Sequence, residues 1–298
     1  MELWFTEKQN RHLNLSVQVK EVLEKKTSSY QDIVVLDTAP FGRMLVLDGF
    51  IQVTEIDEFI YHEMIVHVPL VTHGKPENIL IVGGGDGGSV REALRHPTVK
   101  KVTLVEIDRE VVEVSRRFFP EISASLSDAR VSVIYEDGVS FLQDQAKDQA
   151  ASYDVIVVDS TEPVGPAESL FSYQFYDNAA KALHRDGVLV AQTESPFHNR
   201  QLVYSSYQYI KELFPVADLY LAPVPSYPGG LWSFALGSLK KDPRQCQYAE
   251  TSTKDALKDC RYYSSQMHGS AFALPPFLKN LLSASVQEKD GKKGQSPT

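Results

Sequence analysis

Cysteines and long apolar segments are both scarce in this 298-residue sequence. Its two cysteines, Cys246 and Cys260, are not in CxxC spacing, so we expect neither a disulfide framework nor a metal site, and we expect a reducing, cytoplasmic environment. No apolar run reaches the roughly 18 residues of a membrane span. The N-terminus lacks the basic and apolar regions of a signal peptide, so none is expected. The net charge of −9 disfavours nucleic acid or an anionic membrane as a partner and favours a cationic small molecule.

The segment 79–89, ILIVGGGDGGS, is predicted to form a strand, a glycine turn and the start of a helix. Glycines are needed there because a Cβ would block both the turn and a ligand that approaches the backbone at a helix N-terminus. Such loops usually receive a phosphate, which Asp86 would repel. The sequence therefore predicts a ligand that presents a cation, rather than a dinucleotide.

Strands and helices alternate after residue 78. This alternation predicts right-handed crossovers and a doubly wound, mostly parallel seven-stranded α/β sheet. The connection between the last two strands is too short for a helix, so the last strand is expected to be antiparallel to its neighbour. The predicted strands are 79–82, 101–107, 131–135, 153–158, 187–192, 217–222 and 231–237, and the predicted helices are 111–119, 139–149, 175–183 and 202–213.

Residues 1–60 are predicted to form a small antiparallel β domain, because apolar and polar residues alternate and Asp48-Gly49 marks a turn. On the pattern alone this domain could be a lid or an oligomer edge. A helix is predicted over 57–68, with an apolar face and an end at Pro69 and Gly74. We expect 61–285 to form the α/β domain and the polar residues 286–298 to be a disordered tail.

Acidic residues follow the predicted parallel strands: Asp86, Glu106, Asp137, Asp159 and Glu194. Because ligands bind beyond the carboxyl ends of such strands, these acids are expected to share one cleft, where a cation would relieve their repulsion. Glu106 lies 21 residues after Gly85, where a carboxylate commonly binds ribose hydroxyls. Any one of these acids could instead cap a helix, and Asp137 could be a turn former.

Two loops also carry candidate site residues. The segment DSTEPVGP, from Asp159 to Pro166, contains two prolines and a glycine that fix its backbone, so it suits a gate over a ligand. The loop SYPGG presents Tyr227, whose ring could equally serve packing.

The motifs GGGDGG, VEID, EDG, DSTEPVGP and SYPGG, in this order and spacing, resemble those of the polyamine aminopropyltransferases. LDGFIQ and DEFIYHEM upstream also fit, and the resemblance covers about 13–278. It implies a small N-terminal β domain before a methyltransferase-like Rossmann domain, and a homodimer or homotetramer. It further implies aminopropyl transfer from decarboxylated S-adenosylmethionine, a co-substrate, to putrescine, giving spermidine and methylthioadenosine without a metal or cofactor.

The resemblance also implies roles for individual residues by matching position. Asp159 would be the catalytic base, and Tyr61 would orient the attacking amine. The residues that would bind the donor or methylthioadenosine are Gln31, His62, Asp86, Glu106, Asp137, Gly138 and Pro166. Those that would bind the polyamine are Gln52, Tyr61, His62, Asp86, Asp159, Glu162, Gln192 and Tyr227. Members of that family carry either His or Gln at the position of His62, and some carry Asp at the position of Glu162.

The sequence pattern also fits other functions. An S-adenosylmethionine methyltransferase would share the fold, but its substrate carries a carboxylate near Asp86. Two like charges about 4 Å apart cost roughly 4 kcal/mol at an effective dielectric of about 20. A nicotinamide dehydrogenase would place pyrophosphate against the same acid. A non-catalytic polyamine-binding protein is a further alternative. The acceptor could also be cadaverine, agmatine or spermidine, because packing sets the pocket length.

Overall fold

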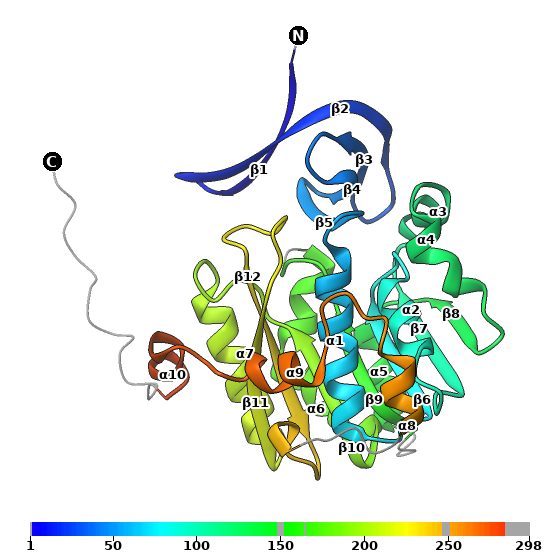
Figure 1. Ribbon diagram of the computed structural model, residues 1–298, viewed down its shortest axis with the longest axis vertical. Coiled ribbons are helices and arrows are strands. Elements are labelled where there is room, and N and C mark those ends of the chain that lie inside the picture. The colour runs from blue at the N-terminus through cyan, green and yellow to red at the C-terminus, as the bar shows by residue number, and fades with distance from the viewer. Residues whose placement is uncertain (1, 148–151, 164, 246–250, 284–298) are drawn as a thin grey trace, which may run out of the picture.

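The computed structural model describes residues 2–147, 152–163, 165–245 and 251–283, with the backbone alone at 166, 251 and 252. The predicted disordered tail and Cys246 lie outside the described residues. Within them, a small sheet from the start of the chain sits above a larger α/β unit (Figure 1). None of the described helices is long and apolar enough to cross a membrane.

The N-terminal sheet has five strands, each antiparallel to the next, as the alternation predicts. The turn before the last of them places Asp48 and Gly49 at positive φ, 49° and 87°. The strands are β1 (Leu3–Asn10), β2 (Leu13–Thr27), β3 (Asp32–Thr38), β4 (Gly42–Leu47) and β5 (Phe50–Thr54). The division of the chain into domains at residue 60 stays a prediction. Strand β5 ends at Thr54, and the first helix begins at Glu58.

The second sheet has seven strands in the order β11-β12-β10-β9-β6-β7-β8. The strands from β10 to β8 in this order are parallel, and β12 is antiparallel to both of its neighbours, which confirms the expected reversal at the end. The strands are β6 (Asn78–Gly83), β7 (Lys101–Glu106), β8 (Val131–Tyr135), β9 (Tyr153–Asp159), β10 (Leu183–Gln192), β11 (Val216–Pro223) and β12 (Leu231–Ser238).

Helices cover both faces of this sheet because alternate strand residues point to opposite sides. Ile79 and Ile81 of β6 pack with residues of α1, α2 and α9, whereas Leu80 and Val82 pack with α5, α6, α7 and α10. The helices are α1 (Glu58–His73), α2 (Gly88–Leu94), α3 (Arg109–Phe118), α4 (Pro120–Ser123), α5 (Gly138–Lys147), α6 (Tyr173–Ala182), α7 (Arg200–Leu213), α8 (Thr251–Ala256), α9 (Ser265–Ala271) and α10 (Pro276–Ser283). Helix α4 and the last three helices were not predicted.

The prediction for α1 was wrong in two respects. The helix continues through Pro69 to His73 and ends at Gly74, whose φ is 84° and whose N–H bonds the Leu70 carbonyl oxygen. It is also buried along its whole length from Tyr61, rather than on one face. Proline removes one helical hydrogen bond, and packing on every side compensates for that loss.

The segment between α8 and α9 crosses the outer face of α1 (Figure 1). Buried Glu63 of α1 accepts hydrogen bonds from the backbone N–H groups of Arg261, Tyr262 and Tyr263, at 2.8, 2.8 and 2.7 Å. One carboxylate therefore fastens this segment over the central helix.

We predict that Glu63→Ala lowers the free energy of unfolding by about 3 kcal/mol, because it leaves these N–H donors without acceptors. Urea unfolding measures the change. Exposed Glu121 of α4 provides the control, and its replacement by alanine should change stability by less than about 0.5 kcal/mol. Equal effects of the two variants would contradict the role given to Glu63.

Candidate active site

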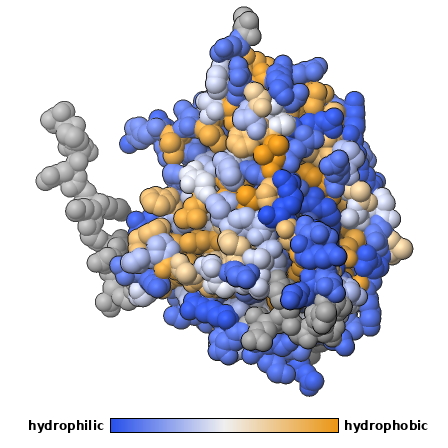
Figure 2. Space-filling model, in the orientation of Figure 1, coloured by the Kyte–Doolittle hydropathy of each residue, from blue (hydrophilic) through white to orange (hydrophobic). Residues whose placement is uncertain are grey.

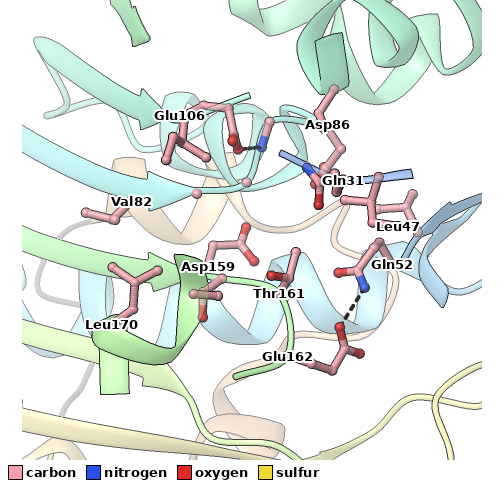
Figure 3. A pocket seen from close by; sticks show the side chains of 18 of the residues that line it. Gln31, Leu47, Gln52, Val82, Asp86, Glu106, Asp159, Thr161, Glu162 and Leu170 are labelled. Atoms are coloured by element: carbon pink, nitrogen blue, oxygen red, sulfur yellow. Dashed lines mark hydrogen bonds between the residues drawn. The ribbon is translucent and has the colours of Figure 1, made fainter. Parts of the chain in front are cut away.

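A cavity lies beyond the carboxyl ends of β6, β7 and β9, and residues of β4 and β5 form its opposite wall (Figure 3). This is the edge at which the acids were expected to meet. The predicted site residues that line the cavity are Gln31, Gln52, Tyr61, His62, Asp86, Glu106, Asp137, Gly138, Asp159, Glu162 and Tyr227. Gln192 is not among the lining residues, and the side chain of Pro166 lies outside the described residues.

The glycine turn packs directly against the end of the neighbouring strand β9. Gly83 and Gly84 have φ of 81° and 70°, and a Cβ on them would lie 2.2 Å from the Asp159 carbonyl oxygen and 2.7 Å from its Oδ2. Only glycine combines this backbone conformation with such a close approach. The turn therefore forms the floor of the cavity, and Asp159 packs directly against the turn.

Asp159 ends β9 and is buried, with a donor on each carboxylate oxygen. Tyr61 Oη donates to Oδ1 at 2.7 Å, and Ser89 Oγ donates to Oδ2 at 2.6 Å. Burial and the nearby charge of Asp86 raise the pKa of Asp159, while the charge of His62 and these two hydrogen bonds oppose the rise. A carboxylate with a raised pKa beside a tyrosine is suited to accept a proton.

Asp86 belongs to a buried chain of charges. His62 is placed between two carboxylates, with Nε2 3.2 Å from Asp86 Oδ1 and Nδ1 2.6 Å from Glu58 Oε2. Arg91 holds Glu58 from behind through two hydrogen bonds of 3.0 and 2.8 Å. Gly88 N–H also donates to Asp86 Oδ1 at 2.7 Å. Sequence reasoning missed Glu58 and Arg91. The spacing of Glu58 and His62, four residues apart on α1, could have indicated the first, whereas Arg91 lies on α2.

These linked charges fix the protonation states of His62 and Asp86. Burial lowers the pKa of His62, but Asp86 and Glu58 together raise it well above its usual value. Burial likewise raises the pKa of Asp86, and the charge and hydrogen bond of His62 outweigh it and lower that pKa. His62 is therefore a cation that donates through both nitrogens, and Asp86 remains a carboxylate at neutral pH.

A second group of polar residues lies at the end of β7. Glu106 accepts hydrogen bonds from the backbone N–H groups of Gly85 at 3.1 Å and Asp108 at 2.9 Å (Figure 3 shows the first). Burial raises the pKa of Glu106 to about 7. Asp108 Oδ1 caps α3, and its Oδ2 accepts from Gln31 Nε2 at 2.9 Å. Asp108 was missed, although it is the second acid of the VEID motif.

Asp137 has the capping role that was left open as an alternative. Its oxygens accept hydrogen bonds from Val139 N–H at 3.2 Å and from the Ser140 N–H and hydroxyl at 3.2 and 2.9 Å, at the start of α5. Asp137 and Gly138 nevertheless line the cavity near Glu106. The cap and the lining position are compatible because the carboxylate remains half-exposed.

The loop after β9 closes the other end of the cavity. Gln52 Nε2 donates to Glu162 Oε2 at 2.9 Å, and Tyr227 Oη donates to the Gln52 carbonyl oxygen at 2.7 Å (Figure 3 shows the first pair). Gln192 Nε2 donates to the carbonyl oxygen of Ser160 at 3.0 Å. Gln192 therefore fastens this loop from behind, whereas Gln52, Glu162 and Tyr227 face the cavity.

Two further buried acids, Glu7 and Glu194, lie behind Glu162. Glu194 was expected in the cleft but is not among the lining residues, and sequence reasoning missed Glu7. Glu7 of β1 accepts a hydrogen bond from Ile51 N–H at 2.8 Å, and burial together with the charge of Glu162 raises its pKa to about 7. Burial and the charge of Glu162 raise the pKa of Glu194 well above its usual value. Glu194 Oε1 has no hydrogen-bond partner among the described residues. This end of the cavity therefore favours a cation.

Two groups in the described part of the chain have metal-ligand side chains within 4.8 Å of one another. In the first, formed by His62, Asp86 and Asp159, the charged imidazole has no free lone pair for a metal. In the second, Glu92 is paired with two arginines, and burial raises the pKa of Cys260 to about 12, so its thiol is protonated. Neither group fits a metal, and we propose none.

Two family models match the chain. Residues 58–247 match the model described as the spermine/spermidine synthase domain, and residues 3–55 match the spermidine synthase tetramerisation domain. The chain is 49% identical over 287 residues to the polyamine aminopropyltransferase of Moorella thermoacetica, covering 96% of this chain and 99% of the relative. It is 47% identical over 285 residues to that of Bacillus mycoides, covering 95% of this chain and 100% of the relative.

Solved structures agree with these relatives. A spermidine synthase in complex with the transition-state analogue AdoDATO superimposes with a TM-score of 0.89 at 34% identity, over 94% of each chain. The spermidine synthase of Thermotoga maritima gives a TM-score of 0.86 at 33% identity, also over 94% of each chain. The match to a tetramerisation domain supports assembly into an oligomer. The chain belongs to the family of the polyamine aminopropyltransferases and spermidine synthases.

Proposed function

We propose that this protein is a spermidine synthase that transfers the aminopropyl group of decarboxylated S-adenosylmethionine to putrescine. One observation carries the proposal: two buried carboxylates share one cavity wall, and contact with His62 lowers the pKa of Asp86 while burial raises that of Asp159. Carboxylates whose environments drive their pKa values apart take different roles. Asp86 is suited to hold an ammonium, and Asp159 to accept a proton. Membership of the family supports aminopropyl transfer as the reaction.

The donor would bind along the ends of β6, β7 and β8. Glu106 and Gln31 would hold the ribose, while Asp137 and Gly138 would contact the adenine. Asp86 would bind the aminopropyl ammonium. Intact S-adenosylmethionine has a carboxylate there, and the cost of roughly 4 kcal/mol for like charges disfavours it. His62 would act through Asp86, because both of its nitrogens already donate to carboxylates.

The reaction needs no cofactor, because the sulfonium already makes the neighbouring carbon electrophilic. The acceptor nitrogen forms a bond to that carbon, and the carbon–sulfur bond breaks with its electron pair moving to sulfur. Putrescine is protonated in water, with an amine pKa of about 10.4 by analogy with lysine. Asp159 would accept the proton that must leave the nitrogen, and Tyr61 would direct its lone pair. Alignment of the three reacting atoms supplies much of the remaining acceleration.

The distal ammonium of the acceptor would bind at the acidic end of the cavity. Glu162 lines that end, and Glu7 and Glu194 lie behind it with raised pKa values, so a bound ammonium would favour the charged forms of these carboxyl groups. Gln52 and Tyr227 would form the walls of the channel. An acceptor with one nitrogen at Asp159 and a second, charged nitrogen at Glu162 would use both ends of this channel, which favours putrescine over a monoamine.

We also propose that the N-terminal domain forms a homodimer or homotetramer. Apolar side chains interrupt the hydrophilic surface over this domain (Figure 2). Those exposed on β1 and β2 are Leu3, Trp4, Leu13 and Val22, at 47%, 53%, 40% and 46%. Covering such residues by a second copy would remove apolar surface from water.

The decisive experiment is mass spectrometry of the products formed from decarboxylated S-adenosylmethionine with putrescine, cadaverine, agmatine and spermidine in competition. We predict spermidine and methylthioadenosine as the main products. Asp159→Asn should reduce turnover by about 100- to 10,000-fold, because a general base is lost, while calorimetry should show that the donor still binds. Activity within threefold of wild type would contradict the assignment of Asp159.

Asp86→Asn tests donor recognition. Loss of a charged hydrogen bond should weaken binding of decarboxylated S-adenosylmethionine by about 10- to 100-fold and narrow the gap to intact S-adenosylmethionine. Calorimetric titration with decarboxylated and with intact S-adenosylmethionine measures the ratio of the two affinities. Methylthioadenosine, which has no ammonium, is the control and should bind with unchanged affinity. An unchanged ratio would mean that Asp86 only shapes the turn.

Glu162→Gln tests acceptor recognition through pH. Burial raises the pKa of Glu162 to about 7, against the hydrogen bond from Gln52, so in the free enzyme this group gains its charge as pH rises through 7. The KM for putrescine in the variant, divided by that in wild type, should therefore increase about tenfold between pH 6 and 8. Exposed Glu168→Gln is the matched control. A ratio that does not vary with pH would contradict this role.

A further inference from the structure

The carboxylate of Asp159 receives a second hydrogen bond from a residue that no motif singled out. Ser89 Oγ donates to Asp159 Oδ2 at 2.6 Å, and Ser89 is fully buried in the first turn of α2. Ser89 is not among the residues that line the cavity, so it contacts Asp159 from behind. We propose that Ser89 is a positioning residue that fixes the orientation of Asp159 and keeps its carboxylate ionised for proton acceptance. This inference rests on the proposed function.

The geometry gives Ser89 control of one carboxylate oxygen. On one side of Oδ2 lies the backbone of Gly84, where a Cβ would be only 2.7 Å away. On another side lies the Ser89 hydroxyl, and Tyr61 holds the other oxygen at 2.7 Å. Rotation of the carboxylate would break both hydrogen bonds at once. The glycine turn thus brings both a bare backbone and a hydroxyl donor against the same side chain.

The electrostatic surroundings show why a neutral donor matters at this position. The groups that face Asp159 are Asp86 from the glycine turn, Tyr61 and His62 from α1, Ser89 from α2 and Tyr227 from the loop between β11 and β12. Burial and Asp86 favour the protonated form of Asp159, whereas His62, Ser89 and Tyr61 favour the carboxylate. Tyr61 and His62 also line the cavity, so their replacement would alter substrate contacts. Ser89 can be changed without touching that surface.

Ser89→Ala isolates this interaction. Loss of a donor to the ionised form should raise the pKa of Asp159 by about 0.5–1 unit. The acid limb of kcat/KM for putrescine should therefore move to higher pH. We expect the kcat/KM of the variant, divided by that of wild type, to fall three- to tenfold further on the acid side of the profile than on the alkaline side. Titration of the amine cancels in this ratio, and the KM for the donor should not change.

Two further variants separate positioning from a general packing defect. Ser115 is an equally buried helical serine whose hydroxyl has no partner among the described residues, so Ser115→Ala should leave the pH profile unchanged. Ser89→Thr retains a hydroxyl and should restore the wild-type profile. A ratio that is constant with pH in Ser89→Ala, or the same shift in Ser115→Ala, would overturn the inference.

Infrared difference spectroscopy against pH gives a readout that does not need turnover. The C=O band of protonated Asp159, identified by its loss in Asp159→Asn, should persist to higher pH in Ser89→Ala than in wild type. If the wild-type protein transferred no aminopropyl group, the proposed function would fail, and this titration would still decide whether Ser89 controls Asp159. Identical titrations of the band in both proteins would overturn the inference.

Discussion

Two carboxylates share the wall of one buried cavity, and much of the surrounding structure supports this arrangement. Oxygens of Asp86 and Asp159 and a nitrogen of His62 lie within 4.8 Å of one another. Two negative charges at that separation repel by roughly 3–4 kcal/mol at an effective dielectric of about 20. The protein divides the two roles through different partners. Asp86 has a charged partner, His62, which Glu58 and Arg91 hold in place, whereas the direct side-chain donors to Asp159 among the described residues are the neutral hydroxyls of Tyr61 and Ser89. One acid therefore stays charged while the other can titrate, and cationic substrates would complete the balance of charge.

The sequence predicts the parts of this design that depend on local pattern. The glycine turn after β6 and the alternation of strands and helices follow from glycine chemistry and periodicity, and both are confirmed by the seven-stranded sheet. The convergence of acids at the strand ends follows from the topology of parallel sheets, because carboxyl ends of neighbouring parallel strands meet at one edge. Residues 79–89 thus predict the position of the cavity without any knowledge of its walls.

The features that the sequence does not predict depend on contacts between elements that are distant in sequence. The central helix α1 reads as amphipathic, yet it is buried on every side because the segment from Arg261 to Tyr263 covers the face that the pattern leaves for solvent. Glu7 looks like a surface residue in a short alternating strand, and its burial depends on β5 folding back beside β1. Ser89 looks like an ordinary first-turn serine, and only the placement of β9 next to β6 gives its hydroxyl a carboxylate to bind. No local pattern encodes these partners.

The N-terminal sheet does more than add an oligomer edge in this architecture. Its strands carry Gln52 in the wall of the cavity and Glu7 behind it, while Gln31, in the loop before β3, reaches the opposite end through Asp108. Both ends of the cavity therefore contain groups from the two sheets. Because Gln52 of β5 donates a hydrogen bond to Glu162, the packing of β4 and β5 over the strand ends helps to hold the acid at the acceptor end in position relative to Asp159. An acceptor whose attacking nitrogen and distal ammonium do not match the span from Asp159 to Glu162 would lose one of those two contacts, so the selectivity for chain length would depend on the domain packing that positions Glu162 as well as on the side chain itself.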